Sequence, residues 1–322
     1  MMQAPFFSVV IPTHNRVDRV ERALRSITNQ SMDDYEIVVV DDGSSDSTPQ
    51  YLVGVQSDRC QTLRNEPNRG VSASRNRGVA ASRGEFVVFL DDDDEFRPTA
   101  LTAIRARCEA LPELDFLWGA RLIHEKDANG REIGTRQDDW SNLQQPIRDT
   151  EFLPMVLEIA TNSAFAIRRK LFLDVGGFDE QLKVSEDRDL FLRLAERRHW
   201  GGAVAEIIID VDEHFKDSLS RNVGFRAGPD IDLRVIDKHR EYLERAEHRE
   251  FMNTYLLTIF AGFLQAGNRS SAVRIFNELR QRDALDAQVL RKYLRHAPEF
   301  RALKSLLRYN SLRRLLGGRD QT

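Results

Sequence analysis

The sequence predicts an α/β fold, with a doubly wound and mostly parallel sheet followed by an α-helical C-terminal region. In the first hundred residues, short runs of β-branched residues alternate with segments of helical periodicity. From about residue 225 onward, only the helical period continues. Strands that alternate with helices at this spacing are typical of parallel sheets, because the helices serve as crossover connections between parallel strands.

The composition fits a globular protein. The chain has 322 residues, 41% of them hydrophobic and 30% charged, which suffices for one large domain with an appendage or for two domains. Its two cysteines, Cys60 and Cys108, form neither a disulfide framework nor a zinc-ligand spacing. The apolar run from Phe6 to Ile11 is too short for a signal peptide or a spanning helix. We therefore expect a cytoplasmic protein.

Four strands are expected in the first hundred residues. They cover Phe7–Ile11, Glu36–Val40, Thr62–Arg64 and Glu85–Leu90. The third is the weakest, and the other three are short apolar runs bounded by polar residues, as buried strands of parallel sheets are.

Three helices are expected between these strands. Apolar residues recur at helical spacing over Val17–Ile27. Thr48 is the expected N-cap of the second helix, and Pro49 is its first-turn residue. The third helix, Val71–Ser82, is rich in alanine and serine, so we expect it to pack closely.

The rest of the chain is less regular up to residue 222 and helical beyond it. A strand is expected at Asn162–Ile167, a glycine turn at Gly176–Asp179 and a helix at about Glu186–Arg198. The helical pattern over Phe260–Phe276, broken by a central Gly-Asn pair, predicts an αα-hairpin.

Polar loops follow the four predicted N-terminal strands. They cover residues 12–16, 41–46, 65–70 and 91–95. In open α/β sheets, ligands bind outside the carboxyl ends of the strands. The four loops are therefore expected to form one site.

Four consecutive aspartates, Asp91–Asp94, stand at the end of a hydrophobic strand. Such a concentration of charge is unfavourable when unpaired, and a divalent cation such as Mg²⁺ or Mn²⁺ would relieve it. The alternative is a solvated acidic turn that caps the next helix. His214 is a candidate for a further metal ligand, and the alternative for it is a structural role.

Two further segments carry candidate residues for binding or catalysis. Asp42 lies in a loop with ordinary turn chemistry, but at a strand end its carboxylate is placed to accept from a base or a ribose. Arg75 is a candidate for binding a diphosphate. Glu186 and Asp187 follow Ser185 at the start of a predicted helix, where they either favour the helix dipole or include a general base.

Together these segments resemble the family 2 glycosyltransferases, which have the GT-A fold. The matching segments are Val10–Asn15, Val40–Asp46, Asn68–Gly78, Gly84–Asp94, Gly176–Asp179 and Glu186–Asp187. Six segments in the family's order are far more specific than any one of them. The resemblance covers about residues 6–222 and leaves the C-terminal hundred residues outside.

The resemblance implies a role for each matching residue. The implied nucleotide-binding residues are Pro12, Thr13, His14, Asp42, Arg75, Asp91 and Asp92. Asp93 is the implied metal ligand, with Asp91 and His214 as further candidates. The implied catalytic base is Asp187, with Glu186 beside it. His14 stands where the family often has tyrosine.

The implied domains are a GT-A domain over residues 1–222 and a helical region over residues 223–322. The first would divide into a nucleotide-binding half, 1–110, and an acceptor half, 111–222. The net charge supports two units, because residues 223–322 have 19 Lys and Arg against 12 Asp and Glu, whereas residues 1–222 have 28 against 39.

The implied reaction is transfer of a hexosyl or hexosaminyl group, with inversion, from a nucleotide-sugar to an acceptor hydroxyl. Asp187 would deprotonate that hydroxyl, and a bound Mn²⁺ or Mg²⁺ would offset the charge of the departing nucleoside diphosphate. UDP is the expected nucleotide, with GDP and TDP as alternatives. The expected acceptor is a glycan or a lipid-linked glycan, as in bacterial surface polysaccharide synthesis, and no nucleic-acid partner is expected.

Two alternative functions belong to other classes. A nucleotidyltransferase would be expected to have a glycine-rich loop with a lysine after the first strand, and Pro12–Arg16 has neither feature. An inactive GT-A scaffold or binding protein would have no need of Asp93 and Asp187. We therefore expect an enzyme.

The basic C-terminal segment raises a separate question. Residues 291–322 carry nine Lys and Arg against two acids, with leucines interspersed. Such a segment either contacts the inner face of an anionic membrane or packs its leucines on the helical appendage or on a homodimer partner. The sequence favours packing.

Overall fold

The structure, a computed structural model, describes residues 4–127, 129–159, 163–213 and 224–284. The chain divides into two compact units, Met1–Ser218 and Leu219–Thr322. Three predictions lie outside the described residues: the domain boundary at residue 222, His214 and the basic segment 291–322.

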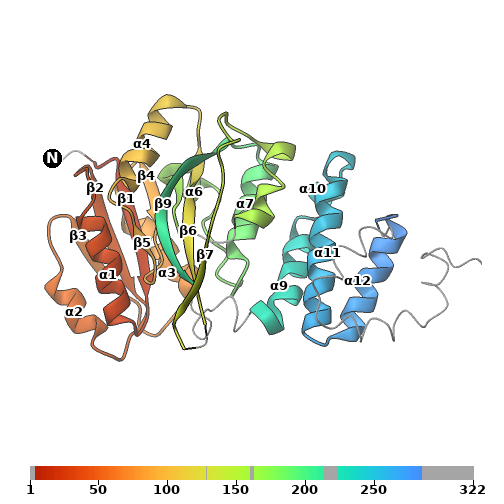
Figure 1. Cartoon of the computed structure of the whole chain (residues 1–322), viewed down its shortest axis with the longest axis horizontal. Coiled ribbons are helices and arrows are strands. Elements are labelled where there is room, and N and C mark those ends of the chain that lie inside the picture. The colour runs from red at the N-terminus through yellow and green to blue at the C-terminus, as the bar shows by residue number, and fades with distance from the viewer. Residues whose placement is uncertain (1–3, 128, 160–162, 214–223, 285–322) are drawn as a thin grey trace, which may run out of the picture. The chain divides into compact units, whose positions relative to one another are not determined.

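In the described part of the first unit, nine strands form a single sheet (Figure 1). The strands are β1 (Phe7–Thr13), β2 (Tyr35–Asp41), β3 (Cys60–Arg64), β4 (Phe86–Phe89), β5 (Glu95–Phe96), β6 (Phe116–Lys126), β7 (Glu132–Gln137), β8 (Phe165–Arg168) and β9 (Gly201–Glu213). Their order is β3-β2-β1-β4-β8-β6-β9-β5, and β7 pairs with β6. All except β5, β7 and β8 point the same way, so the sheet is mixed but mostly parallel, as predicted.

The helices of the first unit connect and cover these strands. They are α1 (Val17–Thr28), α2 (Thr48–Gly54), α3 (Val71–Ala81), α4 (Ala100–Ala110), α5 (Met155–Glu158), α6 (Arg169–Asp174) and α7 (Glu186–Glu196). The prediction that Thr48 is the N-cap is wrong by one residue: the helix begins at Thr48 and its N-cap is Ser47. The Thr48 N–H, which has no partner within the helix, bonds to the Asp46 carboxylate at 2.9 Å. Pro49 lies in the first turn, as predicted.

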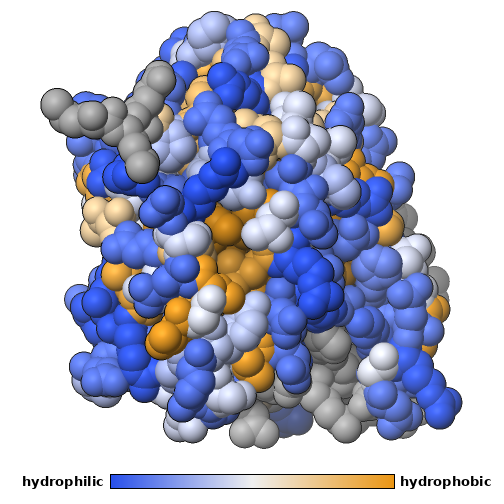
Figure 2. All heavy atoms as spheres, turned by 90° about the vertical axis from the view of Figure 1, so that its left-hand side faces the viewer, coloured by the Kyte–Doolittle hydropathy of each residue, from blue (hydrophilic) through white to orange (hydrophobic). Residues whose placement is uncertain are grey.

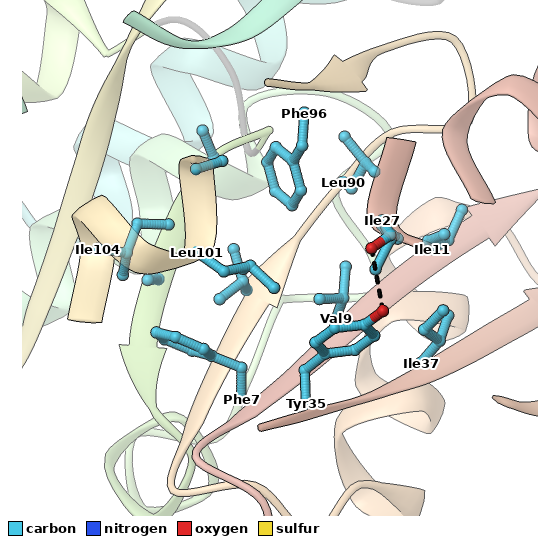
Figure 3. Close-up of a cluster of buried hydrophobic side chains, with 14 of the residues drawn as sticks. Phe7, Val9, Ile11, Ile27, Tyr35, Ile37, Leu90, Phe96, Leu101 and Ile104 are labelled. Atoms are coloured by element: carbon cyan, nitrogen blue, oxygen red, sulfur yellow. Dashed lines mark hydrogen bonds between the residues drawn. The ribbon is translucent and has the colours of Figure 1, made fainter. Parts of the chain in front are cut away.

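One face of the sheet is covered by α1 and α4. Side chains from β1, β2 and these two helices form a buried hydrophobic cluster (Figure 3). Phe7 and Val9 of β1 contribute to it, and the Tyr35 hydroxyl donates to the Ile27 carbonyl at 3.0 Å. Burial of large apolar side chains on this face is the main force that holds α1 against the sheet.

The other face carries α3 and an aromatic cluster. Gly78 of α3 lies so close to β1 that a Cβ at this position would be 2.5 Å from Cγ1 of Val10. The close packing predicted for this helix from its many small residues is therefore confirmed at Gly78. Farther along the sheet, Phe165 of β8 meets Phe191 of α7 with ring centroids 5.0 Å apart. The sheet therefore supports both α3 and α7.

The edge of the sheet at β3 is polar. Gln61 and Arg64 of this strand are exposed, whereas Cys60 is buried. Figure 2 shows this side of the molecule as mostly hydrophilic, with a group of hydrophobic side chains near its middle. Polar side chains on an edge strand disfavour pairing with another chain.

The second unit is helical where it is described. Its helices are α9 (Gly224–Lys238), α10 (Arg240–Leu243), α11 (Arg249–Gln265) and α12 (Arg269–Gln281). The predicted αα-hairpin is confirmed: Gly267 has a positive φ of 71°, and the Asn268 side chain caps α12 by accepting from the Ser271 N–H at 3.2 Å. Among the described helices of the whole chain, none is long and apolar enough to cross a membrane.

Candidate active site

The site lies where the order of strands reverses. The chain passes from β1 to β2 and β3 on one side, and then crosses to β4 on the other side of β1. Such a switch point leaves a crevice beyond the carboxyl ends of the two central strands. Thr13 ends β1, and its hydroxyl donates to Oδ2 of Asp92 after β4 at 2.8 Å. The first and fourth polar loops therefore meet, as predicted.

The first loop is also joined to the second. Asn15 has a positive φ of 55°, and its backbone N–H donates to the Ser44 hydroxyl at 2.8 Å. Its side-chain oxygen accepts from the Ser45 N–H at 2.7 Å. These bonds fix the backbone around Pro12, which is buried, and His14, which is exposed. The His14 ring is thus accessible at the rim of the site.

Asp42 joins the second loop to the third. Its Oδ1 accepts from the Asn65 side chain at 2.8 Å and from the Arg69 N–H at 2.9 Å, and its Oδ2 accepts from the Gly70 N–H at 2.8 Å. A carboxylate offers about four acceptor positions. Asp42 therefore organises the loop that leads into α3 and retains little capacity for a ligand.

The acidic run alternates in burial. Asp92 and Asp94 are buried, whereas Asp91 and Asp93 are partly exposed. Burial raises the pKa of Asp92 to about 6, and the Arg16 guanidinium opposes this shift. Burial, together with the negative charges of Asp91 and Asp93, also holds the pKa of Asp94 well above its ordinary value. The run is therefore a partly buried acidic cluster and not a solvated turn.

Two arginines, one at the N-cap of α1 and one in its first turn, compensate part of this charge. Arg16 Nη1 lies 2.8 Å from Oδ1 of Asp92 and 3.2 Å from Oδ2 of Asp93. Arg19 Nη1 lies 3.4 Å from the same oxygen of Asp93. Neither arginine was predicted from the sequence to be a site residue. Their spacing of three residues at the start of a helix beside an acidic strand end was the available signal.

The donor atoms of the acidic run suit a hard divalent cation. Within the ranges that the structure covers, no group of three or more His, Cys, Asp and Glu side chains is arranged to hold a metal. Magnesium-type ions, however, commonly take one or two protein carboxylates and complete their shell with water and phosphate oxygens. Asp91 and Asp93 present partly exposed carboxylates of this kind. Their chemistry therefore fits such a metal.

Arg75 connects the acidic run to the second acidic cluster. Its side chain is buried, and it donates to Oδ1 of Asp91 at 2.5 Å and to Oε1 of Glu186 at 2.9 Å. Burial and the neighbouring Asp187 raise the pKa of Glu186 to about 7, against the opposing charge of Arg75. Both terminal nitrogens of Arg75 thus already bind carboxylates, and the two clusters form one site.

Asp187 lies in the first turn of α7. Ser185, at the N-cap position, has a positive φ of 62°, and the Asp187 carboxylate accepts from the Arg188 N–H at 2.7 Å. Asp187 is partly exposed, whereas Glu186 is buried. Of this acidic pair, Asp187 is therefore the one accessible to a substrate.

A set of hydrogen bonds that was not predicted from the sequence fixes the segment that leads into α7. Asp189 is buried and pairs with Arg193, which also donates to the Gly177 carbonyl at 2.6 Å. From α3, Asn76 bonds to both the N–H and the carbonyl of Phe178, at 2.8 and 2.9 Å. The predicted glycine turn is thus fixed between α3 and α7.

Comparison with solved structures supports the fold. The chain is similar to Staphylococcus aureus TarS 1–349 in its complex with UDP-GlcNAc, with a TM-score of 0.64 and 20% identity. The match covers 91% of this chain and 82% of that one. The fold is therefore of the GT-A type, as predicted.

Curated relatives match a shorter stretch. An uncharacterized glycosyltransferase of Haemophilus influenzae is 28% identical over 196 residues, which are 59% of this chain and 62% of that protein. A putative colanic acid biosynthesis glycosyl transferase, WcaA of Escherichia coli, is 28% identical over 198 residues, 60% and 67% of the two chains. A GalNAc(5)-diNAcBac-PP-undecaprenol β-1,3-glucosyltransferase of Campylobacter jejuni is 42% identical over 128 residues, 39% and 40% of the two chains.

These alignments leave part of each relative unmatched. The chain spans less than two thirds of the length of the first curated relatives, 62% and 63%. The family model for glycosyl transferase family 2 matches residues 8–176, which is more than half of the chain. The chain therefore belongs to glycosyl transferase family 2.

Proposed function

We propose that the protein is an inverting glycosyltransferase that moves a sugar from a UDP-sugar to an acceptor hydroxyl. The observation that carries the proposal is the Arg75 bridge, which places Asp91 and Glu186 on one guanidinium. A transferase of this type needs a cation-binding donor site and a base on the opposite side of the reacting carbon. The two acidic clusters supply these two elements within one site.

The donor would lie against the first, second and fourth loops. Thr13 and Pro12 line the end of β1, and His14 is exposed beside them for contact with the base. Asp93 and Asp91 would hold a Mn²⁺ or Mg²⁺ ion, which supplies charge stabilisation for the leaving diphosphate. Asp92, bound to Thr13, would position this segment and face the ribose.

Asp187 would act as the general base. Its carboxylate takes the proton of the acceptor hydroxyl while that oxygen forms the new bond to the anomeric carbon and the bond to the diphosphate oxygen breaks. Attack from the face opposite the leaving group inverts the configuration. Glu186, paired with Arg75, would hold the first turn of α7 in place.

The relatives support a class of acceptor. The names of the Escherichia coli and Campylobacter relatives refer to colanic acid synthesis and to an undecaprenol-linked glycan. A glycan or lipid-linked glycan acceptor would agree with both names. An inactive scaffold is the second candidate function. The observation in its favour is that both terminal nitrogens of Arg75 already bind carboxylates and not a diphosphate. Failure of the protein to bind a nucleotide donor would support it.

The test compares Asp187→Asn with the wild type. Loss of the base should lower kcat for sugar transfer by about 10² to 10⁴-fold. Because the proposed base acts on the acceptor hydroxyl and not on the nucleotide, UDP affinity in the presence of Mn²⁺ should remain unchanged. Transfer is measured with a panel of UDP-sugars, and product stereochemistry by nuclear magnetic resonance. Retained activity in the variant, or a product with retained configuration, would contradict the proposal.

A further inference from the structure

Three arginines at the N-cap and in the first half of α1 pair with acidic side chains. Arg16 pairs with Asp92 and Asp93, Arg19 pairs with Asp93, and Arg22 lies 3.0 Å from Glu95 and 3.5 Å from Asp212. Arg19 and Arg22 are three residues apart in α1 and so lie on one side of the helix, and Arg16 is the N-cap residue before them. Arg16 and Arg19 thus place two cations of the protein beside the site proposed for a metal, whereas Arg22 pairs with carboxylates outside the run 91–94.

Asp92 and Asp93 are held differently. Asp92 is 4% exposed and lies 2.8 Å from both Arg16 and Thr13. Asp93 is 26% exposed, and its arginine contacts are 3.2 and 3.4 Å long. Charge-assisted hydrogen bonds between N–H and carboxylate are usually about 2.7–2.9 Å. Asp92 is therefore fixed, whereas Asp93 can exchange its partners.

We propose that Arg16 and Arg19 act as counter-ions of Asp93 that weaken its binding of a free divalent cation and favour binding of the cation together with a nucleoside diphosphate. This inference rests on the proposed donor site. Two guanidinium groups beside the Asp93 carboxylate repel a second cation. A diphosphate offers those guanidinium groups new anionic partners, to which arginine binds well in a bidentate manner.

The consequence is coupling between the two ligands. If the nucleotide draws Arg19 away from Asp93 and weakens the 3.2 Å contact of Arg16 with Asp93, while Arg16 keeps its 2.8 Å bond to Asp92, it raises the affinity for metal. By linkage, the metal then raises the affinity for nucleotide by the same factor. Arg16 and Arg19 are positioning residues in this account, since they act on the metal through Asp93. The nucleotide would therefore load with its metal rather than after it.

Arg19→Gln is the informative variant. Arg16 also compensates the buried Asp92, so its replacement risks the fold. Arg19 pairs with the more exposed Asp93, and glutamine removes its charge while keeping a polar side chain, although a shorter one. Arg22→Gln is the matched control, because Arg22 lies on the same helix and pairs with Glu95 and Asp212 outside the run 91–94.

The experiment measures Mn²⁺ binding by electron paramagnetic resonance, with and without saturating UDP, GDP or TDP. Circular dichroism verifies that each variant is folded. Arg19→Gln should bind Mn²⁺ alone about fivefold more tightly than the wild type, as expected for loss of one partly exposed charge. The enhancement by nucleotide should shrink by a similar factor, and Arg22→Gln should match the wild type.

Three results would overturn the inference. Unchanged or weaker Mn²⁺ binding in Arg19→Gln, alongside nucleotide-dependent binding in the wild type, would reject it and leave the proposed donor site intact. An equal effect of Arg22→Gln would also reject it, because the effect would then reflect general charge. Absence of Mn²⁺ binding to the wild type with every nucleotide would reject the donor site itself, and the inference with it.

Discussion

At the scale of single residues, the site consists of carboxylates that each have a defined donor. Asp42 binds the third loop, Asp92 binds Thr13 and Arg16, and Glu186 binds Arg75. Burying charges costs free energy even when they are paired. The arrangement therefore lowers the free energy of unfolding, but it holds several negative charges close together, as sites for cationic ligands or proton transfer require.

The free-energy cost of burying charge can be measured at Glu186. Its pKa in the folded protein is about 7, above the ordinary 4.5. An acid with a raised pKa stabilises the fold while it is protonated, so this contribution is complete below pH 4.5 and is lost as the pH rises through 7. Glu186→Gln is permanently neutral and still accepts from Arg75. At pH 8 it should be more stable than the wild type by about 3 kcal/mol.

Urea unfolding at pH 5 and pH 8, with EDTA present, tests this prediction. The stability gain should be clear at pH 8 and small at pH 5. Lys170→Gln, which changes an exposed residue outside the site, is a suitable control. A variant that is less stable than the wild type at pH 8 would show that the charged Glu186–Arg75 pair stabilises the fold.

At the scale of elements, the site depends on how closely α3 approaches the sheet. The helix carries Arg75 and Asn76, which reach the acidic run and the glycine turn. Its distance from β1 is set at Gly78, where no side chain fits over Val10. The geometry of the site is therefore linked to a packing contact away from the chemistry.

Gly78→Ala should test this link. Its Cβ would lie 2.5 Å from Cγ1 of Val10 and 3.3 Å from Cγ2 of Val40. Overpacking of this kind costs about 1–3 kcal/mol, more than the ~1 kcal/mol gained in helix propensity. Gly54→Ala in α2 is the control, because nothing lies within 4 Å of its Cβ position. Chemical denaturation should show destabilisation only in Gly78→Ala, and equal stabilities would contradict the packing account.

Most elements near the site could be predicted from the sequence. Strands β1, β2 and β4 are continuous apolar runs, and α1 has a clear helical period, so local pattern and burial agree. In contrast, β6 and β9 were not predicted. Their pairing contains register shifts near Gly119 and Ala120, and β9 begins with two glycines, so neither follows a regular strand pattern.

The convergence of the loops was predictable, but their bonding was not. The rule for parallel sheets predicts that the four loops lie together, and it requires no knowledge of side-chain contacts. The partners of Asp92 and Glu186 lie 76 and 111 residues away, on Arg16 and Arg75. Which arginine reaches which carboxylate depends on rotamers and helix orientation, which residue spacing does not encode.

At the scale of the whole molecule, the candidate site belongs to the first compact unit. All four loops and α7 lie within Met1–Ser218, and the second unit is helical where it is described. The net charge changes sign near the same place in the chain, since residues 1–222 are acidic and residues 223–322 are basic. We propose that the first unit carries the transferase activity and that the second serves contacts with acceptor, membrane or partner.

We propose above all that the site binds a nucleoside diphosphate through a metal held at Asp93. Isothermal titration of the purified protein with UDP, GDP and TDP, each with Mn²⁺ and then with EDTA, tests it most directly. We predict that one nucleotide, UDP, binds with Mn²⁺, that EDTA weakens its binding, and that Asp93→Ala weakens it by at least about tenfold. Absence of binding by a folded wild-type protein to all three nucleotides would contradict the claim and indicate a GT-A fold that serves as a scaffold.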